Sequence, residues 1–215
     1  MLEAAKFDFI LFEDTTIVGD RYGGSMELDL KNATLAPKLD PIPLLPVMAQ
    51  DTSHIGLIAT ASTTFYPPYL LARLFSTVDS LTGGRAGWNM VTSSEKNAAL
   101  NFGMDKLLPP TVRYDIADEY VDLVKQLWDS WEEGALVADP GTGVYVDHTK
   151  VHKIDFEGEH FRSRGPLNTV RSPQGYPVLA QAGASERGRE FSSKNAEVVL
   201  GMMTGGVPGM KAYRE

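Results

Sequence analysis

A serine at the expected start of a helix is the clearest candidate for an anion-binding residue. Ser185 follows the apolar run 177–183 and opens the segment Ser185–Gly188. A helix N-terminus presents free backbone N–H groups, so a serine there forms a seat for a phosphate group or an oxyanion. Arg187 or Arg189 can add charge-assisted hydrogen bonds to such an anion. Simple capping of the helix by Ser185, with nothing bound, is the alternative.

Two adjacent carboxylates follow another apolar run. Glu13 and Asp14 come directly after residues 7–12, whose apolar and aromatic side chains predict a buried strand. Neighbouring side chains on a strand point to opposite faces, so these two carboxylates do not share one proton. We expect one of them to face a site at the C-terminal end of the strand.

The histidines give no support for a metal site. His148 and His152 have i, i+4 spacing, but Pro140, Gly141 and Gly143 lie just upstream and no helical pattern spans the pair. We therefore expect surface or local hydrogen-bonding roles. The sequence has no cysteine, which excludes disulfides, Cys-ligated zinc, iron–sulfur clusters and a cysteine nucleophile.

Common catalytic and nucleotide-binding motifs are missing as well. The sequence contains no GxGxxG after a strand, no P-loop, no HExxH and no GxSxG. The motifs that usually indicate a dinucleotide-binding protein, a P-loop protein or an α/β-hydrolase are therefore absent. No catalytic residue can be named from such a motif.

The elements that must position Asp14 and Ser185 alternate along the chain. Strands are expected at residues 7–12, 54–64, 86–93, 177–183 and 196–202. Helices are expected at 43–49, at 69–79, over about 115–133 and from 185 onward. The third helix has an apolar stripe close to i, i+4, i+7 spacing that ends at Trp131. Two stretches, 15–43 and 138–165, have little periodicity and read as long connections.

This alternation predicts an α/β fold with a parallel sheet. Polar residues gather where the strands end: Asp14, then Thr60 and Ser62–Thr64, then Asn89 with Thr92 and Ser93, then Gln181. Open doubly wound sheets and closed (β/α)8 barrels both place their sites at these ends. A barrel typically needs about 250 residues, so five strands look like part of one.

The charge and the apolar runs of the sequence argue against nucleic acid and membranes as binding partners. The chain has 215 residues and a formal net charge of −8, which disfavours general nucleic-acid binding. Pro41, Pro43 and Pro46 and scattered charges interrupt every apolar run before it reaches the roughly 20 residues of a membrane span. No signal peptide is visible after Met1, so we expect a cytoplasmic protein with no membrane role.

Several short motifs occur in an order typical of one enzyme family. They are Thr63–Thr64 ahead of Pro68–Tyr69, Asp79–Arg85, Trp88–Ser93, Arg113–Asp115 with Ala117–Tyr120, Leu127–Trp131, Arg171–Gly175 and Gln181–Gly188. Taken together, they make the chain resemble the bacterial-luciferase-like flavin monooxygenases. The nearest branch contains nitrilotriacetate monooxygenase component A, dibenzothiophene-sulfone monooxygenase and long-chain alkane monooxygenase.

The resemblance implies a TIM-like barrel that uses reduced FMN and O2. In this family a flavin C4a-hydroperoxide oxygenates a small organic substrate, and a separate NAD(P)H-dependent flavin reductase supplies FMNH2. The protein positions and shields the cofactor, which carries the difficult chemistry. These motifs do not identify the substrate.

The resemblance also assigns cofactor-binding residues, position by position. Asp14 and Thr60 match flavin-contacting residues, Tyr114 matches a tyrosine at the phosphate side, and Ser185 matches the serine that seats the phosphate. Asn89 and Ser93 are weaker candidates near the ring. Pro110 stands where some relatives carry a histidine or another polar side chain, and Ser94 replaces a further polar residue.

Length is the largest departure from the family. We expect residues 1–215 to form a single, incomplete barrel domain equivalent to about strands 2 to 6, an N-terminal fragment of a family member. Such a chain by itself should bind FMN weakly, whereas the full-length protein is expected to be a homo-oligomer. Two alternatives stay open: a non-catalytic partner subunit of such an enzyme, and an open α/β protein that binds another phosphate ligand through Ser185.

Overall fold

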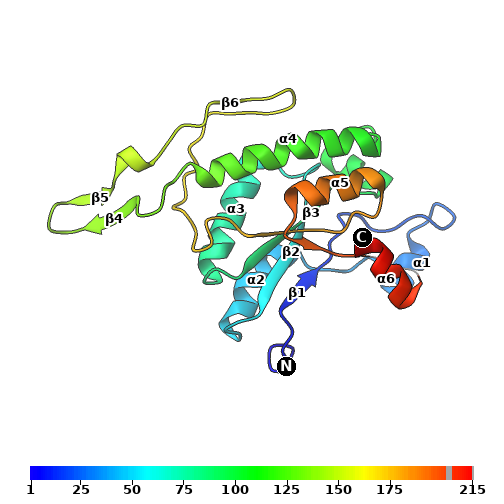
Figure 1. Cartoon of the computed structure of the whole chain (residues 1–215). Helices are drawn as coiled ribbons and strands as arrows, with labels where there is room; N and C mark the ends of the chain where they lie inside the picture. The colour runs from blue at the N-terminus through cyan, green and yellow to red at the C-terminus, as the bar shows by residue number, and fades with distance from the viewer. Residues whose placement is uncertain (202–204, 215) are drawn as a thin grey trace.

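A five-stranded parallel sheet forms the centre of the molecule, with strand order β1-β2-β3-β8-β9. The computed structural model describes residues 1–201 and 205–214 (Figure 1). The strands of this sheet are β1 (Phe9–Phe12), β2 (Gly56–Ser62), β3 (Ala86–Val91), β8 (Val178–Gln181) and β9 (Val198–Val199). The sheet is curled like half of a barrel, which confirms the predicted α/β class and the partial barrel.

Helices cover the outer face of this sheet in chain order. They are α2 (Pro41–Gln50), α3 (Pro68–Leu81), α4 (Pro110–Asp129) and α5 (Glu186–Asn195), each packed against the next or against a neighbouring strand. Prolines begin three of them, because proline has a helical φ and lacks only an N–H that the first turn would leave unpaired. The alternation of strand and helix read from the sequence is therefore present.

Strand side chains divide between the two faces with period two. On β2, Leu57, Ala59 and Ala61 point to the helices and join the hydrophobic core, whereas Thr60 and Ser62 point the other way. On β3, Ala86, Trp88 and Met90 join the core, whereas Asn89 and Val91 face inward. The inner face of the sheet is therefore more polar toward the C-terminal ends of these strands.

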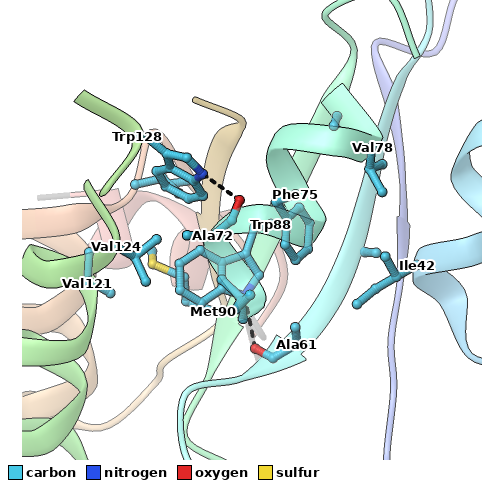
Figure 2. Packing of buried hydrophobic residues seen from close by; sticks show 14 of the residues in the cluster. Ile42, Ala61, Ala72, Phe75, Val78, Trp88, Met90, Val121, Val124 and Trp128 are labelled. Atoms are coloured by element: carbon cyan, nitrogen blue, oxygen red, sulfur yellow. Dashed lines mark hydrogen bonds between the residues drawn. The ribbon is translucent and has the colours of Figure 1, made fainter. Parts of the chain in front are cut away.

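Two tryptophans dominate the core and have their polar atoms satisfied. Trp88 of β3 is fully buried, and its indole N–H donates to the carbonyl of Ala61 at 3.0 Å. Trp128 of α4 donates in the same way to the carbonyl of Ala72 at 2.9 Å (Figure 2). The two rings meet edge to face with centroids 6.3 Å apart. They fix α4 against α3 and the sheet.

The Asp79–Arg85 motif holds the ends of elements together. The buried Asp79 carboxylate accepts hydrogen bonds from the side-chain and backbone nitrogens of Gln174, at 2.6 and 3.1 Å. The Arg85 guanidinium donates to the carbonyls of Ala49 and Thr52, both at 3.0 Å, where α2 ends. This family motif is structural and does not belong to the site described below.

The third predicted helix is shifted toward the N-terminus. It runs from Pro110 to Asp129 instead of 115–133. Trp131 fits the apolar stripe but lies beyond the helix, where its indole N–H donates to the carbonyl of Leu167 at 2.7 Å. The strands and other helices match their predicted ranges with shifts of a few residues, and residue 202 of the fifth predicted strand lies outside the described residues.

Several elements were not predicted. The stretch 15–43 contains α1 (Glu27–Asn32), none of whose residues is buried. Two hairpins occupy most of the stretch 138–165 and begin just before it: β4 (Leu136–Asp139) with β5 (Val144–Val146), and β6 (Phe156–Glu157) with β7 (Arg162–Ser163). Figure 1 shows the first hairpin extending away from the sheet. The 3-10 helices η1 (Lys96–Phe102) and η2 (His148–Lys150) and the final helix α6 (Gly206–Arg214) complete the chain. Among the described residues, no helix is both long and apolar enough to cross a bilayer.

Candidate functional site

A cavity of about 380 Å³ lies at the C-terminal ends of β1, β2, β3 and β8. This is the edge at which parallel α/β sheets and barrels hold their ligands, and the volume is in the range of small-molecule sites. It is called the main cavity below. Its lining contains the residues Glu13–Thr16, Thr60–Ser62, Phe65, Tyr66, Asn89, Val91–Glu95, Ala98, Tyr114, Gln181 and Ala182.

A chain of hydrogen bonds orients the polar groups of β2 and β3. The Thr60 hydroxyl donates to the carbonyl of Phe12 at 2.7 Å and accepts from the amide nitrogen of Asn89 at 2.8 Å. Because the Asn89 nitrogen is used in this way, its Oδ1 is left as an acceptor, and this buried oxygen has no partner among the described residues. Such an atom is costly to bury unpaired, so it marks a place for a hydrogen-bond donor of a ligand.

A second polar pair lies further toward the C-terminal side, at the end of β2 and just after β3. The hydroxyls of Ser62 and Ser93 are 2.8 Å apart, and the Ser62 hydroxyl also accepts from the backbone N–H of Thr64 at 3.1 Å. Ser93 has φ of 61°, a conformation uncommon for a residue other than glycine. Both serines line the main cavity, as does Ser94. Asn89 and Ser93, the weaker candidates of the sequence, therefore lie on its wall.

Asp14 is the half-buried carboxylate of the main cavity. Burial raises its pKa above the ordinary value of 3.8, and the nearby Lys38 partly opposes this shift. Its neighbour Glu13 is more exposed and forms an ion pair with Lys38 at 2.9 Å. Of the two adjacent carboxylates, Asp14 is therefore the one held in a desolvated site.

Tyr114 joins the start of α4 to the end of β8. Its hydroxyl lies 3.4 Å from the side-chain nitrogen of Gln181, whose side-chain oxygen accepts from the backbone N–H of Gly183 at 2.5 Å. A Cβ built on Gly188 would lie 2.8 Å from the Tyr114 hydroxyl and 3.0 Å from the Ser185 hydroxyl. The two hydroxyls therefore approach the same space, and only glycine fits at position 188.

Ser185 caps α5, as one of the two interpretations of the sequence expected. Its hydroxyl accepts from the backbone N–H of Gly188 at 3.1 Å. It does not itself line the main cavity, but Tyr114, which lies beside it, does. The expectation that Arg187 adds bonds to an anion here is not supported by its contacts, because Arg187 pairs with Asp115 and Asp118.

The aromatic wall of the main cavity was not found from the sequence. Phe65 stacks on Phe102 with ring centroids 4.2 Å apart, and Tyr66 lies next to it. Burial, aided by the charges of Asp40 and Asp14, raises the pKa of Tyr66 to about 12, so its hydroxyl stays protonated. The only sequence signal was an aromatic pair directly before Pro67 and Pro68, which reads as the lead into a helix.

Three further positions singled out by the sequence lie elsewhere. Pro110 opens α4, is exposed and is absent from the lining of the main cavity. His148 lies in η2, whereas His152 follows it and pairs with Glu132 at 2.6 Å. Within residues 1–201 and 205–214 no cluster of three or more metal-ligating side chains occurs.

Comparison with known proteins gives one family. The family model described as luciferase-like monooxygenase matches residues 1–215. Dibenzothiophene-sulfone monooxygenase of Rhodococcus erythropolis is 47% identical over 202 residues, which are 94% of this chain and 45% of that protein. Nitrilotriacetate monooxygenase component A of Aminobacter aminovorans is 45% identical over 204 residues, which are 92% of this chain and 44% of that protein.

Solved structures agree with this fold. The crystal structure of long-chain alkane monooxygenase superposes with a TM-score of 0.94 at 42% identity, covering 99% of this chain and 49% of that one. A riboflavin lyase crystallised with modified FMN and riboflavin gives a TM-score of 0.90 at 38% identity, covering 98% of this chain and 48% of that one. The chain spans about half the length of the curated relatives it matches.

Proposed function

The chain belongs to the luciferase-like monooxygenase family, and from this premise we propose that it is part of an FMN-dependent monooxygenase whose flavin lies in the main cavity. The observation that carries the proposal is the buried Oδ1 of Asn89 on the cavity wall, which has no partner among the described residues. A reduced flavin ring carries N–H groups that can donate to such an acceptor. The similar riboflavin lyase, crystallised with modified FMN, supports the choice of cofactor.

The remaining side chains fit the two ends of this cofactor. Asp14, Thr60 and Ser93 offer polar groups around a ring, and Phe65 and Tyr66 offer an apolar wall against which a planar ring can lie. Tyr114 and the start of α5 at Ser185 would hold the phosphate, because a helix N-terminus with hydroxyl groups beside it favours an anion. Asp14, Thr60, Tyr114 and Ser185 are therefore the proposed cofactor-binding residues.

When bound, reduced flavin would supply the electrons that activate O2 for insertion of one oxygen atom into a small organic substrate. The contribution of this chain is position and shielding. Asn89, fixed by the Thr60 hydroxyl, would set the orientation of the ring, and the apolar wall would keep water away from it. None of the described residues has to act as an acid or base in this scheme.

The source of reduced flavin and the wider assembly belong to the same proposal. A relative named as component A of a monooxygenase implies a second component, and we propose a separate NAD(P)H-dependent flavin reductase for that role. We also propose that residues 1–215 form one unit equivalent to about strands 2 to 6 of the family barrel. The full-length protein is then expected to be a homo-oligomer.

An anaerobic titration of the purified chain with reduced FMN tests the proposal. We expect saturable one-to-one binding, weak because only part of the cavity wall is present, and an Asn89→Leu variant that binds about tenfold or more weakly. Asn32→Leu in the exposed α1 helix is the matched control and should bind as the parent does. Equal affinity of the parent and Asn89→Leu, or no saturation by the parent, would contradict the proposal.

A further inference from the structure

A second cleft, of about 480 Å³, lies beside the main cavity and shares Ser94 with it. Its walls come from η1, from the loop that follows η1, and from the first turn of α4. No cofactor-binding residue proposed above lines this cleft. Its charged residues are Lys96, Lys106, Arg113 and Asp105, an excess of positive charge on a chain whose formal net charge is −8.

Arg113 is the buried member of this group. Only 8% of its surface is exposed, and one terminal nitrogen of its guanidinium donates to the carbonyl of Leu108. Its Nε is buried and has no hydrogen-bond partner among the described residues. Burial lowers the pKa of Arg113, which reflects the cost of holding a cation away from water. An anion placed beside the guanidinium would offset that cost.

The start of α4 adds to this preference for an anion. The helix is 20 residues long and its N-cap is Pro109. No side chain of the part of the chain that the structure describes caps it, and its first turn contains no acidic residue. The backbone N–H groups of that turn and the helix dipole therefore favour negative charge at this point. Lys96 and Lys106 form no ion pair with any described residue, so their charges are available to the same ligand.

Arg113 also borders a third cleft, of about 290 Å³, that shares Phe65 and Tyr66 with the main cavity. Its side chain therefore lies where the two clefts meet, and each cleft adjoins the main cavity. Its neighbour Tyr114 lies on the other side of the helix start, against Phe191 with ring centroids 5.5 Å apart. Arg113 therefore borders the second and third clefts, whereas Tyr114 lines the main cavity.

We propose that Arg113, assisted by Lys96 and Lys106, binds a carboxylate or phosphate group of a substrate whose remainder extends into the main cavity. The anion site stands on the cleft, the buried guanidinium and the uncapped helix. Its assignment to the substrate rests on the proposed function, because that assignment requires the main cavity to be occupied by flavin. The two parts are tested separately.

Calorimetric titrations with malonate and with inorganic phosphate, at low ionic strength, measure the anion site directly. We expect binding by the parent chain and a loss of about tenfold or more in Arg113→Gln. Lys106→Gln and Lys96→Gln change only exposed side chains and should each weaken binding to a smaller degree. These two variants test the anion site if Arg113→Gln fails to fold. Lys153→Gln makes the same charge change on an exposed residue outside the cleft and is the control.

Titrations of the same variants with FMN and with riboflavin distinguish the two sources of an anionic group. If the site serves the substrate, Arg113→Gln and Lys106→Gln leave the ratio of the two affinities unchanged. A selective loss of FMN affinity would assign the site to the flavin phosphate and overturn the substrate assignment.

Two other results would overturn the anion site itself: no binding of malonate or phosphate by the parent, or equal weakening by Lys153→Gln. Anion binding without flavin binding would leave the site standing and refute the proposed function.

Discussion

The hydroxyl of Thr60 determines which way the amide of Asn89 points. It donates to the carbonyl of Phe12 and receives the Asn89 N–H, so the free end of that amide is its oxygen. Both residues are buried, and the two bonds satisfy polar groups that have little access to water. One hydroxyl on β2 therefore sets the hydrogen-bonding character of the cavity wall on β3.

Replacement of Thr60 by valine keeps the shape and removes this hydroxyl. It removes the side-chain donor to the Phe12 carbonyl and the acceptor of the buried Asn89 amide, so Thr60→Val should lower the free energy of unfolding by about 1–3 kcal/mol. Thr60→Ser keeps the hydroxyl and should cost less. Urea denaturation of the two variants measures the difference, and equal stability of both would show that the hydrogen-bond chain is not formed.

Asp14 should make stability depend on pH in a defined direction. Its pKa is raised by burial, so the folded state is stabilised when this carboxyl is protonated and loses that stability as the pH rises through the raised value. Asp14→Asn removes the charge and should therefore raise the melting temperature at pH 7. The gain should disappear below pH 3.8, the ordinary value. Thermal melts of both proteins between pH 3 and 7 test this, and a gain that persists at the lowest pH would contradict it.

The β6–β7 hairpin is bound to α4 through one side chain that acts on several backbone groups. Glu119 of α4 accepts hydrogen bonds from the backbone N–H groups of Glu159, His160 and Phe161 at distances of 2.7 to 3.1 Å. These residues form the turn between β6 and β7. A Cβ on Gly158 would lie 2.0 Å from the Glu119 carboxylate, so the turn can approach the helix only with glycine there.

Glu119→Ala should release this turn and leave the sheet intact. Amide hydrogen exchange at residues 159–161 should become faster, because these N–H groups lose their acceptor, while exchange in β2 and β3 stays unchanged. Glu133→Ala, an exposed residue just beyond α4, is the control. Slow exchange at residues 159–161 in Glu119→Ala would show that the turn is held by other contacts.

The sequence predicted elements well where burial produced an apolar run or an apolar stripe, and poorly elsewhere. The strands around Thr60 and Asn89 are short apolar runs that end in polar residues, so both their existence and the place of their polar ends were predicted. Trp131 continues the apolar stripe of α4 but lies past its end, since a periodic pattern does not show where the last hydrogen bond falls. The helix α1 and the hairpin β4–β5 bury little surface and therefore left no pattern to read. Phe65 and Tyr66 were missed because their position depends on the loop fold, not on a strand or helix period.

At the scale of the whole molecule, the curled sheet has two edges among the described strands, β1 and β9. Both edges carry exposed apolar side chains: Phe9 is 37% exposed and Val199 is 43% exposed. Phe7, directly before β1, is 57% exposed. Unpaired backbone groups beside such side chains form a template for pairing with another chain.

We therefore expect the 215-residue chain to self-associate through these edges, and a charge on β1 to reduce that association. Phe9→Lys places a cation on the edge strand, the device that natural sheets use against pairing. Leu70→Lys makes the same kind of change on the outer surface of α3, where Leu70 is 53% exposed, and should leave association unchanged. Sedimentation velocity over a range of protein concentrations measures the effect. A monomeric parent chain, or an equal loss of association in Leu70→Lys, would show that general surface hydrophobicity, and not the sheet edge, governs the behaviour of the molecule in solution.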